Sequence, residues 1–128
     1  MRYYFFELLA CPECKSDNLE LYELDVKEDK VNLDAERIKC KEKCSYQRKP
    51  AGEVSLDVCK KCINLDVIDG VIICKNCGRW YPIIDGIPRM LNDKYRKYHE
   101  DVEFLKKYLN KIPSDIKSLM KIPNINEK

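Results

Sequence analysis

Apolar and polar residues alternate in the first part of the chain. In NLELYELDV, acidic residues separate Leu19 from Leu21 and from the apolar residues beyond, and this period predicts a half-buried strand over residues 18 to 26. The preceding stretch, residues 3 to 10, is mostly aromatic and aliphatic. We expect it to form a short buried helix or strand.

Two Asp-Gly pairs divide a second apolar region. Asp69-Gly70 lies within LDVIDGVIIC, and Asp85-Gly86 lies between WYPII and IPRML. Because an Asp-Gly pair supplies the positive φ angles of a tight hairpin turn, each pair predicts a hairpin. The prolines of WYPII and IPRML lack an amide donor, so their strands are expected at sheet edges or paired on one side only.

Charged side chains dominate residues 27 to 64. No turn dipeptide interrupts residues 28 to 48, and DAERIKCKEKC can open a helix with Asp34 as its N-cap. We therefore expect an inserted, mainly helical element.

Apolar residues after Asn92 recur at alternating spacings of three and four, which predicts a long helix. They are Tyr95, Tyr98, Val102, Leu105, Leu109 and Ile112. Pro113 ends this helix, and SDIKSLMK predicts another helical turn. The apolar stripe fits packing within the chain or on a partner.

Composition narrows the possible functions. The chain has 128 residues with 24 Lys and Arg against 22 Asp and Glu, so its net charge of +2 provides no strong field for nucleic acid. No apolar run is long enough to span a membrane, and the first residues do not resemble a secretion signal. We expect a cytoplasmic protein. The abundance of Lys, Glu, Ile and Tyr indicates a thermophile.

The cysteines occur mainly in pairs with zinc-ligand spacing. In a C-x-x-C turn both thiolates can bind one ion while local N–H groups point at sulfur. CPEC and CKNCG are two such turns, and we expect one structural zinc bound by Cys11, Cys14, Cys74 and Cys77. These two turns adjoin predicted strands, which favours their pairing over a cross-braced arrangement.

The middle segment carries a second set of cysteines, Cys40, Cys44, Cys59 and Cys62. Three interpretations stay open for this set: a second four-thiolate zinc, disulfides between the two pairs, and unpaired buried thiols. Disulfides are rare in the cytosol except in hyperthermophiles. A redox-active C-x-x-C is disfavoured because no strand-helix-strand layout surrounds these motifs.

These patterns together predict an α+β fold. Residues 1 to 26 and 65 to 92 form a discontinuous, small antiparallel zinc-binding sheet domain, residues 27 to 64 interrupt it as a helical insertion, and residues 93 to 128 form a C-terminal helical extension. No catalytic motif is present, and the single histidine, His99, falls on the polar side of the predicted helix. A four-thiolate zinc leaves no position for water, so the chain is expected not to be an enzyme.

CPEC, together with VIDGVIICKNCGRWYPIIDGIPRML, resembles the TRM-one-twelve family of zinc-binding activator subunits of class I methyltransferases. The resemblance covers residues 1 to 26 and 65 to 92. It implies a non-catalytic subunit that forms a heterodimer with S-adenosylmethionine-dependent methyltransferases, which act on tRNA, rRNA or a translation release factor. RNA would be contacted only through the partner, and no small-molecule substrate is implied.

Docking in this family extends the partner's sheet by one strand, and an apolar edge strand suits that mode. The candidate partner-binding residues are Phe6, Leu9, Ile83, Ile84, Ile87, Pro88, Met90 and Leu91. Because side chains alternate along a strand, part of this set is expected in the core. The central cysteines and the long C-terminal extension depart from the family pattern.

The alternative function is a zinc-ribbon module that binds nucleic acid. It requires a basic face with exposed aromatic side chains, which Lys75, Arg79 and Trp80 would begin. The balanced charge argues against this function, and we expect Trp80 to be buried beneath the second cysteine turn.

Overall fold

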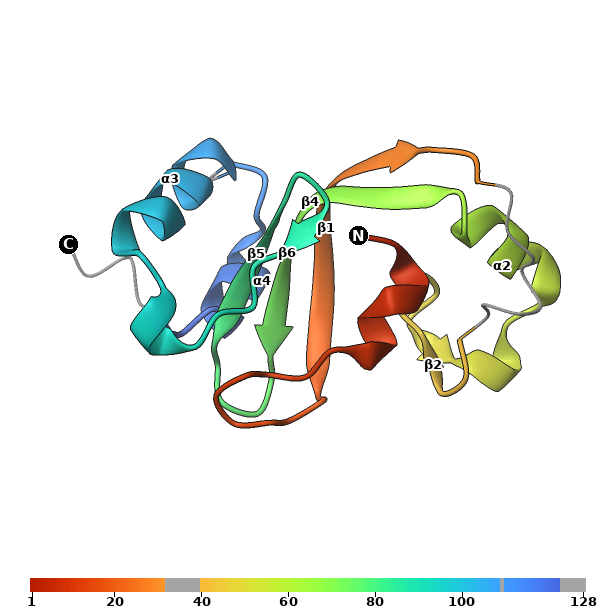
Figure 1. The fold of residues 1–128 in the computed structure, drawn as a ribbon, viewed down its shortest axis with the longest axis horizontal. Coiled ribbons are helices and arrows are strands. Elements are labelled where there is room, and N and C mark those ends of the chain that lie inside the picture. The colour runs from red at the N-terminus through yellow and green to blue at the C-terminus, as the bar shows by residue number, and fades with distance from the viewer. Residues whose placement is uncertain (32–39, 109, 123–128) are drawn as a thin grey trace.

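A four-stranded antiparallel sheet forms the centre of the molecule (Figure 1). The structure is a computed structural model that describes residues 1–31, 40–108 and 110–122. The strands lie side by side in the order β1 (Leu19–Glu28), β4 (Leu65–Cys74), β5 (Trp80–Ile84) and β6 (Ile87–Pro88). Since β1 pairs with β4 along its length, the chain before and after the middle segment belongs to one sheet.

The hairpin expected at Asp69-Gly70 is wrong, because β4 runs through this pair without turning. Gly70 pairs with Glu23 on β1 and with Ile83 on β5. A β-carbon at Gly70 would lie 2.9 Å from the backbone oxygen of Tyr22, so glycine permits a close approach of two strands. The pairing of β1 with β4 shifts register at this level.

The second pair forms the expected hairpin turn. Asp85 and Gly86 have φ angles of 53° and 78°, as a two-residue turn between antiparallel strands requires. They connect β5 to β6. Pro88 lies in the edge strand β6, as expected. For Pro82 the expectation is wrong, because its strand β5 pairs with β4 on one side and with β6 on the other.

Both faces of β4 are buried. Ile72 and Cys74 belong to an apolar cluster with the 3₁₀ helix η1 (Tyr3–Leu8). Val71 and Ile73 point to the opposite face, where they pack with Trp80 and the C-terminal helices. The sheet therefore has a separate apolar core on each side.

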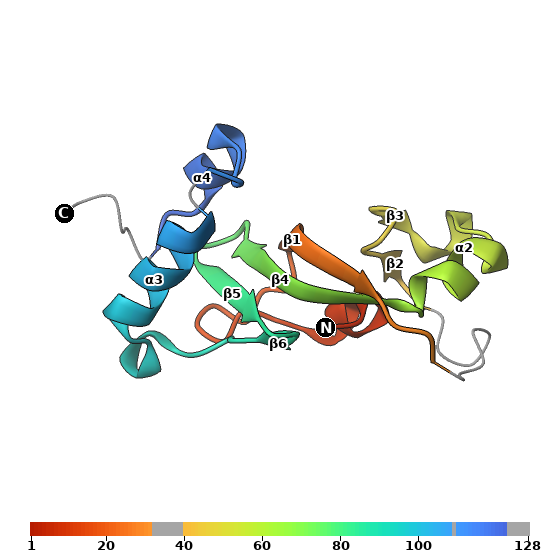
Figure 2. The same ribbon diagram turned by 90° about the horizontal axis from the view of Figure 1, so that it is seen from above.

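The C-terminal region packs on its own chain. A 3₁₀ turn, η3 (Asp93–Tyr95), precedes α3 (Tyr98–Tyr108) and α4 (Ser114–Leu119). Phe104, Tyr108 and Ile112 are buried against the core cluster of Trp80. Figure 2 shows α3 and α4 at one end of the sheet and the middle segment at the other.

The expected apolar stripe of this helix is wrong in its angular position. The helix starts at Tyr98 rather than after Asn92, and its buried positions include Asp101, Phe104 and Tyr108. Tyr95 and Tyr98 are exposed, Val102 and Leu105 are half-buried, Ile112 is buried, and Leu109 is outside the described residues. Tertiary contacts decide which face of α3 is buried. The rings of Phe104 and Trp80 stack with their centroids 6.3 Å apart, and the Arg96 guanidinium donates to the Asp101 carboxylate at 3.1 Å.

The middle segment contains a short strand ladder as well as a helix. Strands β2 (Lys43–Cys44) and β3 (Lys49–Pro50) pair, and η2 (Ala51–Glu53) and α2 (Leu56–Cys62) follow. Asp34, the expected N-cap, lies outside the described residues. Tyr46 packs on Tyr3 of η1 with ring centroids 5.0 Å apart, so this segment rests on the N-terminal helix.

Candidate metal centre

Two backbone turns present the first and last cysteine pairs. In the first turn the N–H of Lys15 donates to the Cys11 carbonyl at 2.8 Å, and Lys15 has a φ of 68°. In the second, the N–H of Gly78 donates to the Cys74 carbonyl at 2.8 Å, and Gly78 has a φ of 83°. Each turn thus ends in the left-handed region that reverses the chain.

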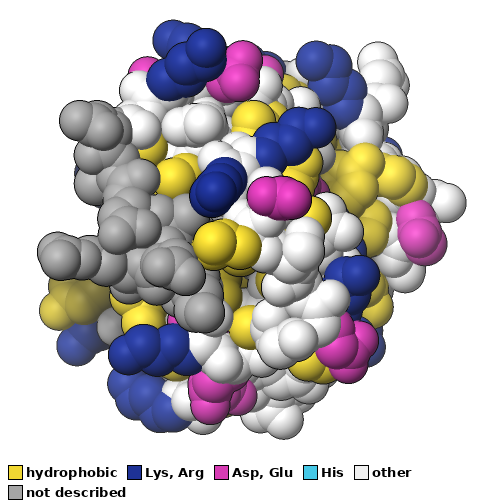
Figure 3. Space-filling view, turned by 90° about the vertical axis from the view of Figure 1, so that its right-hand side faces the viewer, with side chains coloured by type: hydrophobic (Ala, Val, Ile, Leu, Met, Phe, Trp, Pro, Cys, Tyr) yellow, Lys and Arg dark blue, Asp and Glu magenta, His cyan; other side chains and the backbone are white. Residues whose placement is uncertain are grey.

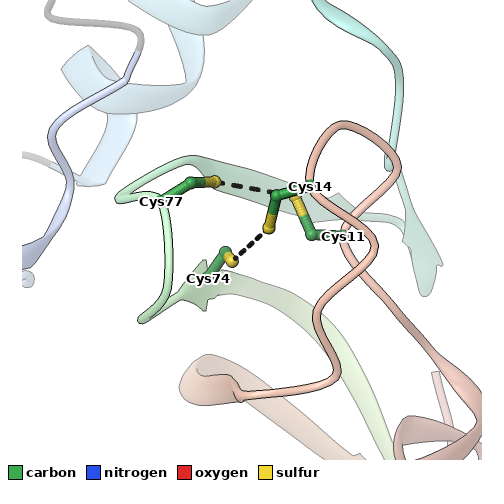
Figure 4. Close-up of side chains that lie close together, drawn as sticks. All are labelled: Cys11, Cys14, Cys74 and Cys77. Atoms are coloured by element: carbon green, nitrogen blue, oxygen red, sulfur yellow. Dashed lines mark hydrogen bonds between the residues drawn. The ribbon is translucent and has the colours of Figure 1, made fainter.

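The four thiols of these turns point into one small space (Figure 4). The sulfurs of Cys11, Cys14, Cys74 and Cys77 all lie within 4.8 Å of one another. The Cys11 and Cys77 sulfurs are 3.7 Å apart, and those of Cys14 and Cys74 are 3.5 Å apart. A tetrahedral zinc with bonds of about 2.3 Å separates its sulfurs by about 3.8 Å, so the set fits that ion.

Polar groups around the sulfurs favour thiolates on the first turn. Burial raises the pKa of Cys11, but the backbone N–H of Cys14 and the Tyr81 hydroxyl outweigh it and lower this pKa overall. The Asn76 amide, 3.4 Å from the Cys14 sulfur, contributes most to lowering the pKa of Cys14 to about 6. Burial raises the pKa of Cys74 to about 12. A bound cation would compensate the burial of thiolates here.

Comparison with known proteins places the chain in a family. Residues 2–86 match the model of the Trm112p-like protein family. The chain belongs to this family. The structure also resembles a chain of the E. cuniculi Mtq2-Trm112 complex, which is responsible for methylation of the eRF1 translation termination factor. That match has a TM-score of 0.51 and 18% identity and covers 72% of this chain and 96% of the other, so it supports the fold. No curated protein sequence matches significantly.

The second set of cysteines in this Trm112p-like chain is gathered more loosely. Cys44 ends strand β2 rather than lying on a helix, and Cys59 and Cys62 both lie on α2. No two of the eight cysteines are joined by a disulfide in this structure. Within residues 1–31, 40–108 and 110–122, no second group of three or more Cys, His, Asp or Glu side chains is as tight as the first.

The expected partner-binding residues divide into exposed and buried ones. Ile87 is 58% exposed and Leu91 39%, while Leu9, Ile84, Pro88 and Met90 are half-buried. Phe6 and Ile83 are buried in the core. For Ile83 the cause is strand alternation, as expected for part of the set.

Two exposed apolar residues of η1 were missed. Phe5 is 43% and Leu8 72% exposed, whereas Tyr3 and Phe6 are buried. A 3₁₀ helix repeats every three residues, so Tyr3 and Phe6 share the inner face while Phe5 and Leu8 share another. The apolar composition of residues 3 to 10 marked the segment but not the helix type that decides which side chains face outward.

The basic aromatic face required by the nucleic-acid alternative is not assembled. Trp80 is buried, as expected, and the Arg79 guanidinium binds the Asp93 carboxylate at 2.7 Å. Figure 3 shows the other end of the molecule, on the side of the middle segment, and there too Lys and Arg side chains are interspersed with Asp and Glu. The single histidine, His99, is exposed on α3.

No helix among the described residues is long and apolar enough to cross a membrane.

Proposed function

We propose that this protein is a non-catalytic subunit that binds, stabilises and activates S-adenosylmethionine-dependent class I methyltransferases of the translation apparatus. Its membership of the Trm112p-like family carries the proposal. The E. cuniculi relative of the same fold is part of a complex responsible for methylating a translation termination factor. For this chain the substrates are tRNA, rRNA or a release factor, recognised by the partner, and the complex acts in the cytoplasm.

In this proposal Cys11, Cys14, Cys74 and Cys77 hold one structural zinc ion. Their sulfur spacing suits a tetrahedral ion, and four thiolates leave no coordination position for water. The ion would link the turn that precedes β1 to the turn between β4 and β5. Residues 1 to 26 and 65 to 92 then act as the zinc-binding unit, with residues 27 to 64 inserted in it and residues 93 to 128 as an extension.

The methyltransferase would dock on an apolar surface around β6, here called the partner face. It comprises Ile84, Ile87, Pro88, Met90 and Leu91, with Leu9 and the newly found Phe5 and Leu8 beside them. Leu9 and Met90 both pack against the core cluster that contains Phe6. A β-carbon at Gly86 would lie 3.2 Å from the Met1 nitrogen, so the start of the chain lies beside the turn between β5 and β6. β6 is the last strand of its sheet, so one of its edges lies outside the ladder and suits strand addition.

The Ile87→Asp change tests this face, because it places a charge on the most exposed apolar side chain of β6. We expect the variant to lose a co-expressed methyltransferase in a pull-down washed at high salt, while zinc content stays at the wild-type level. Val26→Asp is the matched control, since Val26 is also exposed but lies on β1 at the opposite edge of the sheet.

The other outcomes separate the location from the function. Loss of the partner with Val26→Asp alone would move docking to the β1 edge. Wild-type protein that retains RNA but no methyltransferase, with RNA binding that weakens steeply as salt rises, would instead support the nucleic-acid alternative. Apolar docking through strand addition should persist at high salt because exposed ion pairs contribute little to it.

A further inference from the structure

A third turn of the same kind as the two cysteine turns begins at Cys44. The N–H of Arg48 donates to the Cys44 carbonyl at 2.7 Å, and Arg48 has a φ of 58°. Both turns of the first centre are closed in the same way. In each, the N–H of the residue four positions after the leading cysteine donates to the carbonyl of that cysteine, and this final residue has a positive φ. A residue with a β-carbon is disfavoured in this region, so the conformation at Arg48 indicates a constrained turn.

The sulfur of this turn also receives a backbone hydrogen bond. The N–H of Gln47 donates to the Cys44 sulfur at 3.3 Å. In the first centre the N–H three residues after the leading cysteine makes the same contact, from Cys14 to Cys11 and from Cys77 to Cys74. An N–H donor stabilises a thiolate over a thiol, and such bonds orient thiolate ligands around a metal.

Position 47 holds glutamine where the other two turns hold their second cysteine, and Cys40 is available instead. The loop between Cys40 and Cys44 is fixed by Glu7 of η1, whose carboxylate accepts three successive backbone N–H groups from residues 41–43. These bonds are 3.0, 3.1 and 3.3 Å long. The two thiols are therefore held on a loop anchored to the N-terminal helix.

Helix α2 brings the other two thiols to the same region. Cys59 and Cys62 are three residues apart and share one face of the helix. The Cys62 side chain is buried, and it interacts electrostatically with the thiols of Cys40, Cys44 and Cys59. Four thiols from two separate segments thus lie within electrostatic reach of one another.

We propose that Cys40, Cys44, Cys59 and Cys62 bind a second zinc ion that holds the β2–β3 turn against α2. Among the described residues, these four sulfurs do not form a group as tight as that of the first centre. Binding of the ion would draw the sulfurs together around the turn at Cys44, which is already formed. This site does not depend on the methyltransferase or on the first centre.

Native mass spectrometry of the full-length protein, purified under reducing conditions with zinc, tests the proposal. We expect two zinc ions per wild-type chain and one in Cys40→Ser. The decisive variant adds Gln47→Cys to Cys40→Ser. Because position 47 corresponds to the second ligand of the other turns, this double variant should recover the second zinc, which a merely structural role of Cys40 would not produce.

Every other result would overturn the assignment. One zinc in the wild type, with eight thiols that react under denaturing conditions, would mean that the second set is unpaired. One zinc with a mass deficit of about 2 Da per missing thiol pair would mean disulfides. Two zinc ions retained in both Cys40→Ser and Cys59→Ser would place the second ion elsewhere. If the variants fail to fold, wild type loaded with ¹¹³Cd should give two resonances typical of four-thiolate sites, and a single such resonance would refute the second site.

Discussion

The hydroxyl of Tyr81 lies 3.2 Å from the sulfur of Cys11, and both side chains are fully buried. Burial, and then the adjacent thiolate, raise the pKa of Tyr81, so the hydroxyl keeps its proton and donates to the sulfur. Tyr81 belongs to β5, whereas Cys11 lies in the turn before β1. The contact therefore joins the central sheet to the candidate zinc centre and stabilises the thiolate form of one ligand.

Removing this hydroxyl should weaken metal binding while leaving the apolar core filled. For Tyr81→Phe we expect the zinc affinity to fall by about tenfold to a hundredfold, as for other groups that orient metal ligands. Competition with a chromogenic chelator measures the change. Tyr22→Phe is the control, because the Tyr22 hydroxyl contacts the exposed Lys111 carbonyl, far from the cysteines in sequence. Equal affinities for the two variants would show that the Tyr81 hydroxyl does not support the metal centre.

Gly70 is expected to be sensitive to a single added methyl group. Its β-carbon would lie 2.9 Å from the Tyr22 backbone oxygen, and strands β1 and β5 flank it on either side. We expect Gly70→Ala to lower the free energy of unfolding by about 1–3 kcal/mol, as overpacking does. Gly52→Ala is the matched control, since a β-carbon there meets nothing within 4 Å. Chemical denaturation compares the two, and equal stabilities would contradict the close strand approach.

The two Asp-Gly pairs show which part of this fold the sequence can predict. Both satisfy the local requirement for a hairpin turn, but only Asp85-Gly86 adopts the positive φ angles. Gly70 remains in a strand because it has pairing partners on both sides, in Glu23 and Ile83. That difference depends on residues distant in sequence, which a dipeptide signal does not contain.

The cluster of four cysteines was more predictable than the surfaces. Cys11, Cys14, Cys74 and Cys77 each belong to a turn whose ligand spacing is local, and strand signals beside both turns indicated which pairs meet. The face of α3 was placed wrongly because Phe104 takes its position from Trp80, a tertiary contact. Period and composition alone locate an amphipathic helix but do not choose its contacts.

Acid stability should depend on the ion pair between Arg79 and Asp93. Hydrogen bonds from the Arg79 guanidinium hold the pKa of the Asp93 carboxyl below its usual range. A carboxyl with a lowered folded-state pKa stabilises the protein above its unfolded pKa, about 3.9, and loses this contribution as the pH falls through the folded value. We expect Asp93→Asn to flatten the decline in stability below about pH 4.

A variant of Arg79, the other half of the ion pair, checks whether the change in acid stability comes from this interaction. Arg79→Gln should flatten the same acid limb, and combining it with Asp93→Asn should add little, because both changes remove one interaction. Thermal unfolding followed between about pH 2 and pH 7 measures the slopes. Additive changes in the two variants would show that Asp93 and Arg79 act separately.

Tyr108 should anchor the C-terminal helix through a buried carboxylate. Its hydroxyl donates to Asp69 on β4, and Asp69 also accepts the backbone N–H of Asp85 at 3.2 Å. Tyr108→Phe keeps the ring against Phe104 but leaves the carboxylate with one donor fewer, which should cost about 1–3 kcal/mol. Tyr95→Phe is the control, because that ring is 60% exposed. Hydrogen exchange should show faster opening of α3 in Tyr108→Phe only, and unchanged protection of α3 would mean that its apolar contacts suffice to hold it.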